Sequence, residues 1–399
     1  MRPRVLRIFA RYQRFGGEEA VAKRIHADLE DYLEADWFEY STDDLLGKSW
    51  GQRIQAPLKV VHNAPAANHL RALQRERRYQ AFEIHNVLPA LSPGIYKAAF
   101  ELGVPVVHFL HNYRLSCVNG FFLNHGQPCH RCIRGNFLPA VLTRCWRESR
   151  VACGTMGITL QRVRWLKTFS KVDAWVALSE VQKRLHLKMG LPEGKLHVLP
   201  HYLEPTPNFQ TAVPDDGYAL FLGRLSPEKG VIQLIRAWAG IPTSAGRLVI
   251  AGTGPLEGEC RALVNALNLP NVSFTGFVPP SEQGALWAGA KFAVIPSVWD
   301  EPFPLVVLEA WANGRGLVVS DWGSLPETGK GASLVARVED TDGFACALER
   351  ALQERKLAAT LAEQGKRKLR REFGRDLWLR RVAGIYASAG VPFTQRVHR

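Results

Sequence analysis

The sequence predicts an α/β fold of two doubly wound parallel-sheet domains. Strand-like apolar runs alternate with helical patterns in both halves, 399 residues suffice for two hydrophobic cores, and a proline-rich polar stretch divides the halves. This stretch, residues 200–216 (PHYLEPTPNFQTAVPDD), is typical of an interdomain linker. We therefore expect domains at residues 1–200 and 201–370, followed by a C-terminal helix over residues 371–399.

In the first half, short apolar runs predict buried strands, and apolar residues at every third or fourth position predict helices. Residues 20–33 follow the helical period, and Ser92-Pro93 marks the start of a helix over residues 92–103. The strand-like runs are Val5–Ala10, Leu58–His62, Ala81–His85, Val104–Leu110 and Ala174–Leu178. This alternation implies a parallel sheet with helices on both faces.

The second half repeats the alternation more regularly. A helix is predicted over Val231–Ala239, and a long basic helical region over residues 344–390. The strand-like runs are Tyr218–Leu222, Arg247–Ala251, Val272–Thr275, Phe292–Pro296 and Leu317–Ser320. Ligands of doubly wound sheets bind at the carboxyl ends of the strands, so the polar loops after these strands are where chemistry is expected.

The formal net charge of +14 is unevenly distributed along the chain. Residues 51–200 carry 21 Lys and Arg against 7 Asp and Glu, and residues 351–399 carry 12 against 4. A basic surface attracts nucleic acid, anionic lipid or a phosphate-bearing substrate. No nucleic-acid-binding module accompanies the charge, so nucleic acid is not expected as a partner. The segment RVRWLK, residues 162–167, fits a face that lies on a membrane surface.

Other features point to a cytoplasmic protein. No apolar run approaches the roughly 18 residues of a membrane-spanning helix, and the N-terminal segment is predicted to be a strand, not a signal peptide. Seven cysteines, an odd number, indicate a reducing compartment. We expect the protein in the cytoplasm, peripherally bound to the inner face of the membrane.

Two glutamates form the strongest motif, WDEPFPLVVLEA over residues 299–310. Glu301 precedes an apolar helical run, and Glu309 lies within it. A helix N-terminus also offers free N–H groups and a positive dipole to a phosphate or sugar oxygen. The plain alternative is one capping carboxylate and one solvated carboxylate.

A second motif, FLGRLSPEKG over residues 221–230, places Arg224 and Lys229 on the loop after a strand. A guanidinium binds phosphate oxygens in pairs, and an ammonium adds a point charge, so together they neutralise a diphosphate. Taken alone, such a pair is more simply a solvated loop.

AGTGP (residues 251–255) and FTGFV (residues 274–278) follow in order between these motifs, and the chain resembles the retaining family 4 glycosyltransferases. The resemblance covers nearly the whole chain and is most specific over residues 220–327. It implies the GT-B fold, with two Rossmann-like domains facing a cleft. It also implies sugar transfer from a UDP- or GDP-linked donor to a glycan or lipid-linked acceptor in surface polysaccharide synthesis.

The resemblance further implies roles for individual residues. Arg224 and Lys229 would bind the donor diphosphate, Glu301 the sugar hydroxyls, and Glu309 the ribose. The leaving diphosphate would accept the acceptor's proton. Because Arg224 and Lys229 would neutralise its charge, no cofactor is expected for catalysis. The other residues expected at the donor site are Gly16, Gly17, Gly252, Gly254, Phe277, Phe303, Pro304 and Leu305, with Phe277 near the base.

Two matches and one departure complete the resemblance. RFGGE (residues 14–18) matches the family's glycine loop after the first strand, and HNYRL (residues 111–115) matches a segment whose histidine, here His111, faces the donor sugar. His108 is an alternative to His111, and His85-Asn86 is a candidate for the acceptor side. Many members have glycine where this chain has Pro304, and proline lacks the N–H that would reach the sugar.

Five of the seven cysteines lie within residues 117–153. Cys129 and Cys132 have the spacing of a metal-binding knuckle, and Cys117 and Cys145 flank them. Four thiolates bind zinc tetrahedrally, so a structural zinc site is one interpretation. Unligated thiols are the other.

Two functions other than a glycosyltransferase remain open from the sequence, both suggested by the charge. One is a non-catalytic basic protein of the membrane surface, and the other is a nucleic-acid-binding protein.

Overall fold

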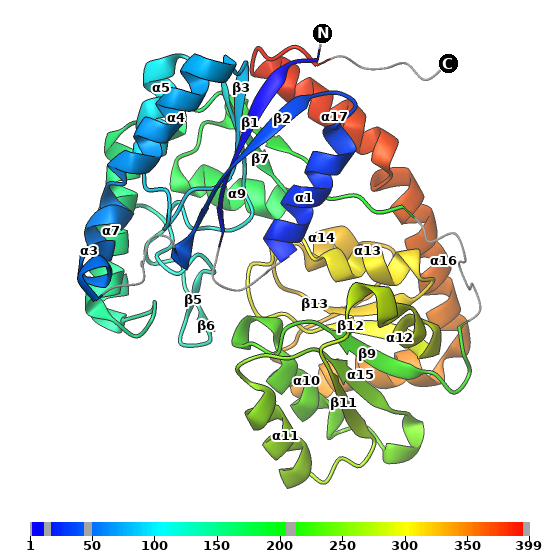
Figure 1. Ribbon diagram of the computed structural model, residues 1–399. Helices are drawn as coiled ribbons and strands as arrows, with labels where there is room; N and C mark the ends of the chain where they lie inside the picture. Colours follow the sequence, from blue (N-terminus) through cyan, green and yellow to red (C-terminus); the bar gives the residue numbers. More distant parts are fainter. Residues whose placement is uncertain (1, 12–16, 44–49, 205–212, 394–399) are drawn as a thin grey trace, which may run out of the picture.

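The computed structural model describes residues 2–11, 17–43, 50–204 and 213–393. They form two α/β domains, each with a six-stranded parallel sheet between helices (Figure 1). The N-terminal sheet contains β1 (Arg4–Arg11), β2 (Glu34–Ser41), β3 (Ala81–Asn86), β4 (Val106–Phe109), β7 (Ala174–Ala177) and β8 (Leu196–Val198). Its helices are α1 (Gly17–Leu29), α3 (Trp50–Val61), α4 (Ala64–Arg77), α5 (Gly94–Leu102), α6 (Leu138–Thr143), α7 (Arg150–Trp165), α8 (Thr168–Lys171) and α9 (Glu180–Met189).

The C-terminal sheet contains β9 (Tyr218–Leu222), β10 (Leu248–Ala251), β11 (Val272–Gly276), β12 (Ala290–Ile295), β13 (Gly316–Ser320) and β14 (Leu334–Ala336). Its helices are α10 (Val231–Trp238), α11 (Glu257–Ala266), α12 (Gln283–Gly289), α13 (Leu305–Ala312), α14 (Leu325–Gly329), α15 (Thr341–Gln353) and α16 (Arg355–Glu372). A short hairpin, β5 (Leu123–Asn124) and β6 (Gln127–Pro128), projects from the N-terminal domain. The two parallel sheets confirm the predicted fold class.

Each sheet has a topological switch point, where the strand order reverses beside the first strand of that sheet. The orders are β2-β1-β3-β4-β7-β8 and β11-β10-β9-β12-β13-β14. In each sheet the chain first builds outward on one side of its first strand and then returns to the other side. Ligands bind in the crevice at such a switch point, here between β1 and β3 and between β9 and β12.

One strand prediction is wrong. Leu58–His62 was expected to be a buried strand, but Leu58, Val60 and their neighbours belong to helix α3. Ala56 and Val60, one turn apart, are buried, and α3 packs against α7 with this face. A short apolar run does not distinguish a strand from one turn of a buried helix face.

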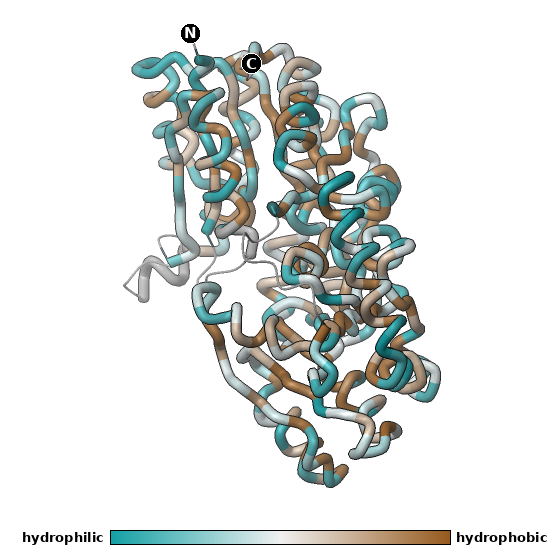
Figure 2. Tube along the Cα trace, turned by 90° about the vertical axis from the view of Figure 1, so that its right-hand side faces the viewer, coloured by the Kyte–Doolittle hydropathy of each residue, from teal (hydrophilic) through white to brown (hydrophobic). Residues whose placement is uncertain are grey.

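The last helix, α17 (Arg375–Ser388), returns to the N-terminal domain. Trp378, Val382 and Tyr386 share a hydrophobic cluster with Val5 on β1 and Val107 on β4. Figure 2 views the side that carries α16 and α17, and shows hydrophilic stretches recurring along its outward helices. Among the described residues, no helix combines the length and the apolar character needed to span a bilayer.

Candidate functional site

A cavity of about 650 Å3 lies between the two domains. Loops that follow β9 and β12 form one wall, through Arg224, Lys229 and Glu301. The N-terminal domain contributes His111 and Arg114, which follow β4. The cavity therefore sits where the carboxyl ends of both sheets meet, as a doubly wound fold requires of a ligand site.

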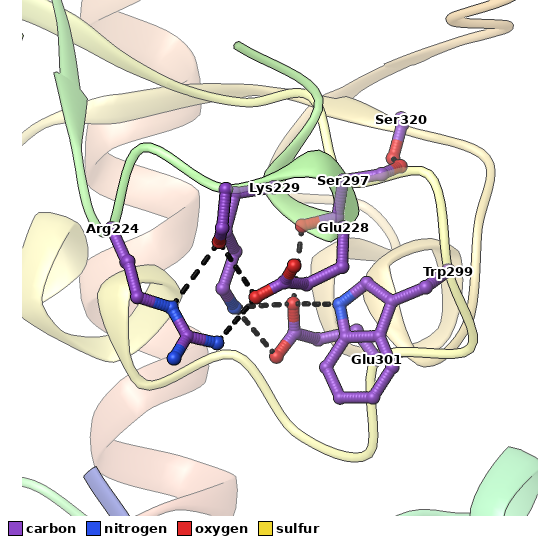
Figure 3. Close-up of polar contacts among 8 residues, drawn as sticks. Arg224, Glu228, Lys229, Ser297, Trp299, Glu301 and Ser320 are labelled. Carbon is purple, nitrogen blue, oxygen red and sulfur yellow. Dashed lines mark hydrogen bonds and ion pairs between the residues drawn. The ribbon is translucent and has the colours of Figure 1, made fainter. Parts of the chain in front are cut away.

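A buried carboxylate anchors the wall of this cavity (Figure 3). The Lys229 ammonium donates to both carboxylate oxygens of Glu301, at 3.0 Å to Oε1 and 2.8 Å to Oε2. Its Oε2 also accepts hydrogen bonds from the Ser297 hydroxyl at 3.1 Å and from Trp299 Nε1 at 2.9 Å. Glu301 is thereby fixed in place, while the Lys229 side chain remains 29% exposed.

Arg224 belongs to a second network on the same loop (Figure 3). Its guanidinium forms an ion pair with Glu228, and its Nε donates to Ser226 Oγ at 3.2 Å. Burial raises the pKa of Glu228, but the Arg224 charge and the Ser226 hydroxyl outweigh it and lower that pKa overall. Glu228 therefore holds a negative charge that orients Arg224 at the cavity.

Close backbone packing fixes the two loops relative to each other. Gly230 has φ +69°, and a Cβ there would lie 1.8 Å from the carbonyl oxygen of Pro296. Gly323 has φ +57°, and its Cβ would lie 2.2 Å from the backbone nitrogen of Glu301. Only glycine fits both positions, because each combines left-handed backbone with a direct backbone contact.

Glu309 reaches the cavity from the middle of α13, whereas Glu301 lies in the loop before that helix. Burial raises its pKa, and the positive charge of Arg24 on α1 opposes this rise. The Arg24 guanidinium lies over the Tyr202 ring at 5.0 Å, and its buried Nε has no hydrogen-bond partner. An acid from one domain and a base from the other thus influence each other across the site.

His111 is the end of a buried polar chain inside the N-terminal domain. Its Nε2 lies 2.9 Å from Nδ1 of His85, and His85 Nε2 lies 2.7 Å from Glu83 Oε1. Glu83 also accepts from Arg7 Nε at 2.7 Å and from the Tyr386 hydroxyl. Burial, followed by the nearby histidines, holds the pKa of His111 well below its usual range, so its ring is neutral at physiological pH.

The structure brings eight of the predicted site residues to the cavity: Arg224, Lys229, Glu301, Glu309, His111, Phe303, Pro304 and Leu305. Gly252 and Gly254 do not line it but pack against the carbonyl groups of Gly223 and Leu225 beneath the loop. Phe277 is 71% exposed and also lies outside the lining. Helix α1 begins at Gly17, and Gly16 lies outside the described residues.

Sequence reasoning missed several residues of the site. Glu228 and Trp299 stand inside the two motifs, so a closer study of the motifs would have found them. Arg114 stands inside the HNYRL motif, although only its histidine was singled out. Arg24 carries no such signal, because only the fold brings its charge near Glu309. His108 does not line the cavity and instead lies 2.8 Å from the Tyr96 hydroxyl in the core.

The cysteine group forms a feature of its own. Cys117, Cys129, Cys132 and Cys145 line one small cavity of about 10 Å3, and all four are free thiols. Within the described parts of the chain, no three His, Cys, Asp or Glu side chains form a set that could hold a metal ion as they stand. The structural zinc site therefore stays a prediction.

The second domain is similar to a known protein family. Residues 205–368 match the family of glycosyl transferases group 1. The chain is 27% identical over 248 residues to an uncharacterized glycosyltransferase of Methanocaldococcus jannaschii, covering 58% of this chain and 63% of that protein. It is 30% identical over 143 residues to O-antigen chain mannosyltransferase B of Escherichia coli, covering 35% of this chain and 37% of that protein. The chain thus spans less than two thirds of either relative.

Solved structures share the fold over almost the whole chain. Sucrose-phosphate synthase from Thermosynechococcus elongatus superposes with a TM-score of 0.69 at 18% identity, covering 97% of this chain and 98% of that one. Anabaena HepE in complex with UDP and glucose gives a TM-score of 0.66 at 17% identity, covering 97% and 100%. These two-domain structures show that the chain has the GT-B fold.

Proposed function

We propose, from a second domain that belongs to the glycosyl transferases group 1 family, that this protein transfers a sugar from a nucleoside diphosphate sugar to an acceptor hydroxyl. The observation that carries the proposal is the pair of cations, Arg224 and Lys229, in one wall of the interdomain cavity. Arg224 and Lys229 face one space beside the N-terminus of α13, which supplies further N–H donors. Three sources of positive potential at one point suit a diphosphate.

Without donor, each cation is held by a carboxylate of its own. Lys229 pairs with Glu301, and Arg224 pairs with Glu228. A bound diphosphate would share both cations with these carboxylates, so the cations need little reorganisation when charge develops on the leaving group. In the proposed reaction the bond from the sugar C1 to the diphosphate breaks, and the acceptor oxygen bonds to C1 on the same face. Attack on the face that the diphosphate leaves makes the reaction retaining. The acceptor's proton passes to a leaving phosphate oxygen, and Arg224 and Lys229 would neutralise the diphosphate charge in place of a catalytic metal.

Further contacts are proposed for the rest of the donor. Glu301 would bind sugar hydroxyls, Glu309 the ribose, and the loop at Phe277 the base. His111, neutral at its place beside the cavity, would contact the sugar from the N-terminal domain. Pro304 precedes α13 and has no N–H, so the sugar loses one backbone donor there relative to a glycine.

The acceptor is proposed to be a growing surface glycan or its lipid-linked precursor. Support comes from the similarity to O-antigen chain mannosyltransferase B and from the solved fold relative described as a lipopolysaccharide outer core galactosyltransferase. A UDP-linked donor is supported by HepE, which was solved with UDP and glucose, and a GDP-linked donor stays open. Acceptors of this kind lie at the cytoplasmic face of the inner membrane, so we propose that the protein works there.

Calorimetric titration with UDP and with GDP tests the donor site. We expect one of the two nucleotides to bind the native chain, and Lys229→Met and Arg224→Met each to weaken binding about tenfold or more, because a hydrogen bond to a charged group contributes about 1.5–3 kcal/mol. Arg236→Met is the matched control, since Arg236 is an exposed residue of α10 away from the cavity lining. Equal affinity in the control and in both site variants would refute this donor site.

A further inference from the structure

The N-terminal domain carries an apolar surface over three neighbouring helices, and we infer that it is a docking surface for an anionic phospholipid bilayer. Of the nine large apolar side chains that are exposed among the described residues, six lie on α3, α6 and α7. We call them the apolar face; they are Leu58, Leu138, Leu142, Val151, Ile158 and Trp165. Isolated apolar residues on a surface are ordinary, but six on one group of helices are not.

Helical geometry places these side chains in rows. On α7, Val151, Ile158 and Trp165 follow each other at intervals of seven residues, which is two turns, so they form one line along the helix. Ile158 is 56% exposed and Trp165 71% exposed. The opposite side of α7 is the buried one, with Met156 and Leu160 in the hydrophobic core. The exposed row of side chains on α7 therefore does not contribute to the hydrophobic core.

The three helices are joined through α7. Helix α7 packs against both α6 and α3, and Figure 1 shows α3 and α7 together at the edge of the N-terminal domain. On α6, Leu138 and Leu142 are one turn apart and both point outward. The six side chains thus belong to one continuous flank of the molecule, away from the side that carries α16 and α17.

Charge identifies the partner as an anionic surface. Residues 131–171 contain nine Lys and Arg and one acidic residue, Glu148. The exposed bases near these apolar side chains in the sequence are Arg131, Arg134, Arg144, Arg147, Arg150 and Lys167. Exposed apolar side chains, a tryptophan and bases in one segment match the layered chemistry of an anionic bilayer, with acyl chains below phosphate headgroups.

The surface also leads to the interdomain cavity. Arg114 lines the cavity, and its guanidinium lies 5.4 Å from the centre of the Trp146 ring in the loop between α6 and α7. Arg147 lies over the same ring at 5.2 Å. A lipid-linked acceptor held at this flank would therefore lie close to Arg114 in the cavity wall. This consequence rests on the proposed function, whereas bilayer docking does not.

Vesicle sedimentation tests the docking surface. The native chain is expected to bind vesicles of equal parts phosphatidylglycerol and phosphatidylcholine, to bind pure phosphatidylcholine at least tenfold more weakly, and to lose binding as salt is added. The double variants Ile158→Glu with Trp165→Glu, and Arg134→Glu with Arg150→Glu, should each weaken binding to the mixed vesicles at least tenfold. These four side chains are exposed or at the helix surface, so the fold should survive.

Val335→Glu, which adds the same charge to an exposed apolar position of the C-terminal domain, should bind vesicles like the native chain. UDP and GDP titrations of every variant separate this inference from the proposed function: nucleotide binding should be unchanged in all of them. Native-like vesicle binding by both double variants would overturn the docking surface. Light scattering could also overturn it, by showing that the native chain is a dimer and that Ile158→Glu dissociates this dimer. A second copy of the chain would then cover the apolar face.

Discussion

The chain from Glu83 through His85 to His111 determines which ring nitrogen of His111 faces the cavity. The Glu83 carboxylate can only accept, because the Arg7 and His85 contacts outweigh burial and hold its pKa low. A His85 ring that donates from Nε2 to Glu83 and accepts at Nδ1 requires His111 to donate from Nε2 to His85. His111 Nδ1 is left as an acceptor, suited to a sugar hydroxyl.

His85 is accordingly a positioning residue, and His85→Ala should lower kcat about tenfold with a smaller change in the donor KM, the scale of one lost hydrogen bond to a buried group. The pH profile distinguishes orientation from mere packing. The buried ring of His111 resists protonation, so the native rate should not fall between pH 7 and 5 on its account. Loss of His85 admits water, raises the pKa of His111 toward about 6.5, and brings an acid limb into that range.

His108→Gln is the control for this prediction. His108 is equally buried but bonds the Tyr96 hydroxyl, so its loss should reduce stability and leave the pH profile of kcat unchanged. A pH profile of kcat for His85→Ala that still lacks an acid limb between pH 7 and 5 would show that His85 serves the fold only.

Some residues of the site can be predicted from sequence motifs, and others only from the folded structure. Arg224, Lys229, Glu301 and Glu309 lie in motifs whose order along the chain is itself a signal. The Arg7–Glu83 pair lies in two apolar strands 76 residues apart, and it exists only because the parallel register of β1 and β3 places these two residues opposite each other. Sequence periodicity marks such strands as buried and gives no indication of a charge pair within them.

At the scale of elements, the hairpin of β5 and β6 and the loops around it are built about the four cysteines. Cys117 Sγ donates to Asn119 Oδ1 at 3.0 Å and accepts from the backbone N–H of Phe122 at 3.4 Å. Burial raises the pKa of Cys132 to about 11 and that of Cys145 to about 12, so without a metal these thiols keep their protons. The four cysteines share a cavity of about 10 Å3.

Metal analysis of the purified protein tests the zinc prediction. We expect one zinc per chain, released together with a fall in Tm when a strong chelator is added, because binding energy of a structural zinc is folding energy. Cys129→Ser should abolish the zinc, whereas Cys346→Ser, at an exposed cysteine of α15, should retain it. A metal-free protein whose Tm is indifferent to chelator would remove the zinc interpretation.

Elements of the second domain followed their sequence patterns more closely than those of the first. Each of the five strand-like runs of the second half became a strand, because all five are flanked by glycine, proline or polar loops. In the first half β2 was missed, since its alternating exposed and buried positions include three acidic residues. β8 and β14 were missed because each is only three residues long, which is too short for a periodic pattern.

At the scale of the whole molecule, the two halves meet through specific polar contacts. His130 beside the hairpin pairs with Asp300 at 2.6 Å, next to Glu301 of the other domain. Glu327 accepts from the backbone N–H groups of Glu180 and Val181 at 2.9 and 3.0 Å, at the start of α9. No sequence pattern predicts such pairs, because they depend on the angle between two independently folded sheets.

The charge distribution follows the same division. Residues 51–200 belong to the N-terminal domain, and α17 packs on that domain, so most of the basic surplus lies in one half. The donor-site cations Arg224 and Lys229 belong to the other half, whose segment 201–350 carries 10 Lys and Arg against 16 Asp and Glu. The molecule thus separates a basic flank suited to a membrane from a locally cationic donor site.

Release of nucleoside diphosphate from a panel of UDP- and GDP-linked sugars tests the central claim most directly. The account predicts that one donor is turned over, slowly with water and faster with a suitable acceptor, and that Glu301→Gln lowers the rate about 100-fold or more, as loss of an active-site electrostatic contact does. Arg236→Met should leave the rate unchanged. Turnover of no donor in the panel, or turnover that Glu301→Gln and Lys229→Met both leave intact, would contradict the account.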